Sequence, residues 1–165
     1  MSWSVQLDMW AEGQDMRATL AIETQNQEVV RRYYEAINRG DAQAAAGEFA
    51  EDAKNFGRPV GRKGIEDRLV DIFTTFPDWK MEILETVASG DVVVVRCRVS
   101  GTHRGVCTMP LNGMPVGVAP TGKRFEVTHM HWHTLRDGKI AEHYANRDDL
   151  GMLRQIGLLP SIAPP

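Results

Sequence analysis

The spacing of the apolar residues changes at Pro77, and this change limits the folds that the chain can adopt. Before Pro77, apolar side chains recur every three or four residues, which is typical of amphipathic helices. After it they mostly alternate with polar ones, as in strands with one buried face. We expect helices at residues 24–40, 42–50, 64–76 and 148–157, and strands at 79–87, 92–101, 124–135 and 139–147.

Helices followed by strands predict an α+β fold. We expect three N-terminal helices to pack on a mainly antiparallel sheet, which forms a small-molecule pocket where the helices close one face. Asp137 and Gly138 give a favoured hairpin turn between the last two strands. Residues 24–160 form this single domain, and 161–165 form a tail. Residues 1–23 have no sustained period and are expected to pack on a partner subunit or to be loosely ordered.

The charge and composition of the chain exclude several function classes. A net charge of −3 over 165 residues provides no basic surface for nucleic acid. No apolar run approaches the roughly 20 residues of a membrane span, so no membrane partner is expected. Cys97 and Cys107 form neither a disulfide framework nor a metal-binding pair. Because the N-terminus also lacks a signal-peptide pattern, we expect free thiols and a cytoplasmic location.

Residues 129–133, with the sequence HMHWH, place three histidines on one face of a strand, because alternate side chains of a strand point the same way. The three positions span roughly 13 Å at about 3.3 Å per residue, too far for one metal ion. Asp137, the acid that follows, belongs to the hairpin turn. We therefore expect no metal site. The histidines either line a pocket or are buried in the core with satisfied hydrogen bonds.

Five motifs occur in the order and context of the SnoaL-like polyketide cyclases, which the chain resembles over about residues 26–157. They are TFPDW at 75–79, GTHRG at 101–105, PTGK at 120–123, DGKIAEHY at 137–144 and DDLGMLRQIG at 148–157. The resemblance implies a cone-shaped α+β barrel of the nuclear-transport-factor-2-like superfamily, with a strongly curved sheet. Its open face implies a homodimer or higher homo-oligomer.

The same resemblance implies a reaction. The characterised cyclases close a ring of an aromatic polyketide by an intramolecular aldol step without metal or cofactor, and an acidic residue near the end of the last strand acts as acid and base. Asp148 occupies that position in this chain. The expected substrate is an apolar or aromatic, polyketide-like small molecule. Two features depart from the family: Tyr144 replaces the usual Trp, and the loop at residues 106–119 is longer.

The predicted site combines this resemblance with the residue types. The residues alone leave Asp148 and Asp149 equally open as the acid and base, and the resemblance favours Asp148. Either of the two is also a suitable cap for the last helix. His131 is expected to polarise a carbonyl group as a second catalytic residue. The expected substrate-binding residues are Asn55, Tyr33, Trp79, Trp132, His133 and Tyr144.

Three alternatives stay open at this point. One is a cofactor-independent hydroxylation or hydration enzyme on the same fold. Another is an epoxide hydrolase, because residues 146–148, Asn-Arg-Asp, resemble the acid–arginine–acid arrangement of limonene-type enzymes. The third is a non-catalytic binder of apolar ligands, since fold alone does not determine function.

Overall fold

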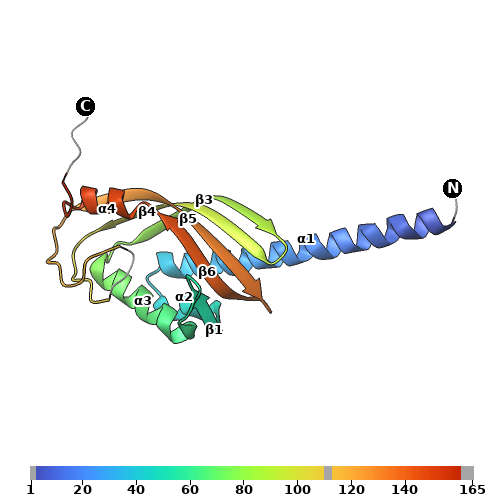
Figure 1. Cartoon of the computed structure of the whole chain (residues 1–165), viewed down its shortest axis with the longest axis horizontal. Coiled ribbons are helices and arrows are strands. Elements are labelled where there is room, and N and C mark those ends of the chain that lie inside the picture. Colours follow the sequence, from blue (N-terminus) through green and yellow to red (C-terminus); the bar gives the residue numbers. More distant parts are fainter. Residues whose placement is uncertain (1–2, 110–112, 161–165) are drawn as a thin grey trace, which may run out of the picture.

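The computed structural model describes the backbone of residues 3–109 and 113–160, so the expected tail at 161–165 lies outside the described residues. Four helices and six strands are described (Figure 1). In chain order they are α1 (Trp3–Asn38), α2 (Ala42–Gly47), β1 (Phe49–Asn55), β2 (Arg58–Pro59), α3 (Gly61–Thr75), β3 (Lys80–Ser89), β4 (Val92–Thr102), β5 (Arg124–Arg136), β6 (Lys139–Arg147) and α4 (Asp149–Gln155).

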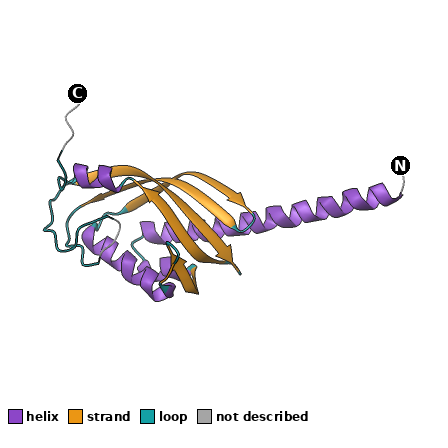
Figure 2. Cartoon of the chain, viewed as in Figure 1, coloured by secondary structure: helices purple, strands orange, loops and turns teal. Residues whose placement is uncertain are grey.

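The predicted α+β fold is confirmed. The six strands form one curved sheet in the order β2-β1-β6-β5-β4-β3. Neighbouring strands are antiparallel except β1 and β6, which are parallel, so the sheet is mixed and open rather than a closed barrel. Helices α1, α2 and α3 lie on one side of the sheet (Figure 2). The core fills the space between these helices and the sheet.

The first helix is longer than the sequence predicts. Helix α1 begins at Trp3 rather than near residue 24, and its N-terminal half projects away from the sheet (Figure 1). It meets the body of the domain at the turn between β3 and β4, where Asn26 donates to the Gly90 carbonyl and Glu23 accepts from the Gly90 amide. Neither α1 nor any other helix in the described part of the chain is apolar enough over a sufficient length to cross a membrane.

The strands β1 and β2 are absent from the sequence prediction. Residues 48–50 were expected to continue the second helix, but α2 ends at Gly47 and β1 begins at Phe49. Phe49 and Ala53 are fully buried in the core, and β1 pairs with the distant strand β6. Tertiary pairing therefore overrides the local helical preference of this Ala-rich segment.

Asp71 of α3 anchors the long loop between β4 and β5. Its buried carboxylate accepts hydrogen bonds from the Thr108 amide at 2.9 Å, from the Thr108 hydroxyl at 2.6 Å and from the Cys107 thiol at 3.3 Å. Burial raises the pKa of Asp71, but these hydrogen bonds outweigh it, and the net pKa is lowered. At the start of the loop, a Cβ on Gly105 would lie 1.9 Å from the Thr74 carbonyl oxygen, so only glycine fits.

We expect Asp71→Asn to lower the free energy of unfolding by about 2 kcal/mol. The NH2 group of asparagine would face hydrogen-bond donors from which the Asp71 carboxylate now accepts. Urea denaturation at neutral pH measures this. The control is Asp67→Asn on the same helix, whose surface ion pair with Lys63 is worth less than about 1 kcal/mol. Equal effects of the two substitutions would contradict an anchoring role for Asp71.

Candidate functional site

A partly open cavity of about 80 Å³ lies between α1, α3, the inner face of the sheet and α4. Most of its wall is apolar, contributed by Tyr33, Ile37, Phe49, Ile65, Leu69, Ile72, Trp79, Met81 and Met152. Seven polar side chains complete it: Asn55, Arg68, His129, His131, His143, Arg147 and Asp149. An apolar cavity with a few convergent polar groups is the usual form of a small-molecule site.

The cavity wall depends on an irregularity between β5 and β6. Leu135 pairs with Ile140, but Thr134 pairs with Glu142, so Ala141 is an extra residue in β6. After such a bulge, the residues that would face outward in a regular strand face inward, and the inward ones face outward. His143 and Arg147 consequently line the cavity.

Two expected binding residues lie outside the cavity, Tyr144 because of the bulge and Trp132 because it alternates with His131 and His133 along β5. Tyr144 shares a face with Ile140 only in an unbroken strand, and in the structure it pairs with Trp132 on the outer face of the sheet. The side chain of Trp132 is 49% exposed and that of Tyr144 is 42% exposed. The structure therefore brings neither Trp132 nor Tyr144 to the cavity.

His131, His143 and Asn55 form a hydrogen-bonded chain in the wall. Asn55 of β1 lies opposite His143 of β6, and the Asn55 Oδ1 atom is 2.9 Å from His143 Nδ1. His143 Nε2 is in turn 2.9 Å from His131 Nδ1. The amide oxygen only accepts, so His143 donates from Nδ1 and accepts at Nε2, and His131 donates from Nδ1. The buried His131 Nε2 atom, which has no partner among the described residues, is then left with a lone pair.

His129 is the second imidazole with unused hydrogen-bonding capacity. The residue is 4% exposed, and neither of its ring nitrogens has a partner among the described residues. Burial, and then the charge of Arg147, lower the pKa of His129 to about 4. A neutral imidazole offers one donor and one acceptor, so His129 can meet both a ligand oxygen and a ligand hydroxyl.

Asp149, at the start of α4, is the carboxylate that the cavity contains. Its Oδ2 atom lies 3.2 Å from Arg147 Nη2. Gly113 of the long loop packs against it so closely that a Cβ there would be 2.8 Å from Asp149 Cβ. Burial raises the pKa of Asp149, and Arg147 opposes this rise only in part.

Asp148, the expected acid and base, has a different position. It is exposed, does not line the cavity, and accepts a hydrogen bond from the Gly151 amide at 2.8 Å as the N-cap of α4. The capping role that the sequence left open between the two acids therefore belongs to Asp148. The cavity position belongs to the next residue, Asp149.

The remaining expected residues divide between the cavity and the core. Asn55, His131, Tyr33 and Trp79 line the cavity. His133 is fully buried beside it, and its Nδ1 atom donates to the Val93 carbonyl at 3.1 Å. Three polar cavity residues were not predicted to line a pocket: Arg68, His143 and Arg147. Asp149 was the alternative that the sequence left open beside Asp148. Arg68 alone had a local signal, because it is a charged residue on the apolar face of a helix.

In the described part of the chain, no three His, Cys, Asp or Glu side chains are grouped so that they could hold a metal ion. The Nδ1 atoms of His131, His133 and His143 already lie within hydrogen-bond distance of protein groups.

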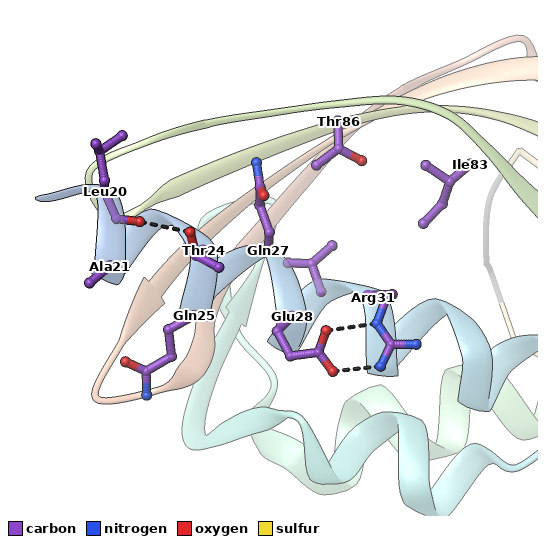
Figure 3. Close-up of a pocket in the computed structure, with 10 residues that line it drawn as sticks. Leu20, Ala21, Thr24, Gln25, Gln27, Glu28, Arg31, Ile83 and Thr86 are labelled. Carbon is purple, nitrogen blue, oxygen red and sulfur yellow. Dashed lines mark hydrogen bonds and ion pairs between the residues drawn. The ribbon is translucent and has the colours of Figure 1, made fainter. Parts of the chain in front are cut away.

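A larger hollow of about 900 Å³ lies between α1 and β3 (Figure 3). It is a surface groove, because Leu20, Thr24 and Gln25 along its α1 side are exposed. Its charged groups, Glu28 and Arg31, bind each other (Figure 3). Since the buried unpartnered nitrogens of His129 and His131 line the smaller cavity instead, that cavity is the better candidate site.

Comparison with known proteins identifies a matching family and solved structures of similar fold. The model of the SnoaL-like polyketide cyclases matches residues 27–156. The solved structure of IdmH from Streptomyces antibioticus, described as a candidate polyketide cyclase, is 31% identical with a TM-score of 0.66, covering 81% of this chain and 99% of its own. No curated protein matches the chain.

Two further solved structures have the same fold. TsrD from Streptomyces laurentii is 25% identical with a TM-score of 0.71, covering 82% of this chain and 97% of its own. AclR from Streptomyces galilaeus, described as a candidate hydroxylase, is 23% identical with a TM-score of 0.71, covering 86% of each chain. At that identity the likeness to AclR extends to the fold alone.

We expect the free energy of unfolding to fall as the pH drops from about 6.5 towards 4.5. Burial lowers the pKa of His129 and of His133 to about 4, whereas an unfolded histidine titrates near 6.5. The unfolded state therefore binds protons that the folded state does not, at about 1.4 kcal/mol per pH unit for each histidine. Burial also lowers the pKa of His131 and His143.

Urea denaturation at several pH values measures this slope. His129→Asn is the matched variant, because it removes one of the titrating groups and should reduce the slope by about one proton. A free energy of unfolding that stays constant between pH 7 and pH 5 would show that these imidazoles are not held neutral.

Proposed function

The chain belongs to the SnoaL-like polyketide cyclase family, and we propose that it closes a ring of a polyketide-like small molecule by an intramolecular aldol reaction in the cavity beside Asp149. The observation that carries this proposal is a carboxylate of raised pKa in a largely apolar cavity. A carboxylate with a raised pKa is a stronger base than one in water and, once protonated, remains an acid near working pH.

The proposed reaction returns every proton. The Asp149 carboxylate removes a proton from a carbon next to a carbonyl group and leaves an enolate. The enolate carbon then forms a bond to a second carbonyl carbon of the same molecule, whose oxygen becomes an alkoxide. The alkoxide takes the proton from Asp149, so the product is an isomer of the substrate and the carboxylate is regenerated.

The two imidazoles that line the cavity with an unpartnered nitrogen, His129 and His131, have different proposed roles. His129, with both ring nitrogens available, donates a hydrogen bond to the oxygen on which the enolate charge develops. His131 is limited by its bond to His143, which leaves Nε2 as an acceptor. His131 therefore orients a hydroxyl group of the substrate rather than polarising its carbonyl.

Asp149 takes the acid and base role expected of Asp148 for a geometric reason. The Asp148 carboxylate is exposed, accepts a hydrogen bond from the Gly151 amide and does not line the cavity. Asp149 lines the cavity and is covered by Gly113, so it is the acid that can reach a ligand in the cavity.

We expect Asp149→Asn to slow proton exchange at an activated methylene by 100-fold or more, the usual range for losing a general base. The measurement follows deuterium incorporation from heavy water into aromatic β-keto esters by NMR. Asp148→Asn is the matched control and should remain within about threefold of the wild type, because asparagine caps a helix as well as aspartate does.

The two variants together decide the assignment. Loss of exchange in Asp148→Asn with exchange kept in Asp149→Asn would refute the role of Asp149. Mass spectrometry of the product is a second test, since ring closure leaves the mass unchanged. A product that has gained an oxygen atom would favour the hydroxylation alternative instead.

A further inference from the structure

We propose that the ligand of this cavity carries a carboxylate group and that Arg68 binds it. This inference rests on the proposed function and deepens it, because it names the class of substrate: a small molecule that carries a free carboxylate group. It depends on Arg68 and its surroundings and not on which residue performs the chemistry.

Arg68 points into the cavity from the apolar face of α3. It lines the cavity together with Ile65, Leu69 and Ile72, which lie at neighbouring positions on the same helix face. Among the described residues, no hydrogen-bond or ion-pair partner is found for its guanidinium group. Two other cations of α3, Arg62 and Lys63, do have partners, Glu51 and Asp67.

The neighbours of Arg68 make its position unfavourable in the free protein. Burial, and then the positive charges of Arg147 and Arg58, lower the pKa of Arg68. A partly buried charge that lacks a counter-charge and lies near like charges destabilises the fold. Such a group commonly marks a functional site, where a ligand supplies the missing interaction.

The charge balance of the cavity also favours an anion. Its lining contains two guanidinium groups, from Arg68 and Arg147, against the one carboxylate of Asp149. Positive charge gathers here although the whole chain has a net charge of −3. Because the charge of Arg147 also lowers the pKa of His129, the cavity disfavours added cations.

The shape of the site favours a carboxylate over a bulkier anion. Guanidinium binds a carboxylate through two parallel hydrogen bonds in one plane. The rest of the cavity, which has a volume of about 80 Å³, is lined mainly by aromatic and aliphatic side chains, which suit a flat ring attached to that group. The unpartnered nitrogens of His129 and His131 then remain available for the other oxygens of the ligand.

Benzoate and benzamide test the proposal directly, because the two have the same shape and differ in charge. Isothermal titration calorimetry at low salt should show benzoate binding to the wild type about tenfold or more tightly than benzamide. In Arg68→Gln this preference should fall to about threefold or less. Lys63→Gln is the control, since it removes one positive charge from the exposed side of the same helix and should keep the preference.

Equal affinity of the wild type for benzoate and benzamide, or no binding of benzoate, would overturn the proposal. A preference that survives in Arg68→Gln would overturn it as well. A lower melting temperature of Arg68→Gln with equal weakening of both ligands would show that Arg68 is structural.

Asp149→Asn separates this inference from the proposed reaction. Removal of the one cavity carboxylate should keep or increase the preference for benzoate, whereas proton exchange at the β-keto esters should be lost. If exchange persists in Asp149→Asn while benzoate binding still requires Arg68, the role of Asp149 as the base fails and the carboxylate site stands. A loss of the benzoate preference in Asp149→Asn would overturn the carboxylate site.

Discussion

The extra residue at Ala141 is the constraint on which the candidate site depends. It reverses the alternation of β6 relative to β5, so His143 and Arg147 face the interior. The parallel pairing of β1 with β6 then places Asn55 opposite His143 and completes the hydrogen-bonded chain to His131. Without the bulge, Tyr144 and Asn146 would face inward, and the cavity would lack both an imidazole and the guanidinium that binds Asp149.

Exclusion of water links the chemistry of the site to the stability of the fold. The same burial that raises the pKa of Asp149 lowers the pKa of His129 and His131. The cavity therefore keeps its imidazoles neutral and its carboxylate basic through one physical effect. These imidazoles bind protons in the unfolded chain at a pH at which they stay neutral in the folded state, so this arrangement makes the domain sensitive to acid.

Local patterns predicted the parts of the structure that depend on local periodicity. The helical and alternating repeats located α3 and the four long strands, and the alternation within HMHWH correctly placed His129, His131 and His133 on one face, which is buried. The bulge had no local signal, because the pairing of two strands determines it. For that reason the inward positions of His143 and Arg147 were not predicted.

Two charged residues one turn apart on α3 show how burial separates a structural role from a ligand-binding one. Asp71 is buried, and its carboxylate accepts from Thr108 and Cys107, so the protein itself accounts for its position. Arg68 is partly buried and faces other cations, with no partner among the described residues. Burying a charge without compensation is unfavourable, so the protein alone explains Asp71 but not Arg68. The missing counter-charge is most simply supplied by the molecule that the cavity binds.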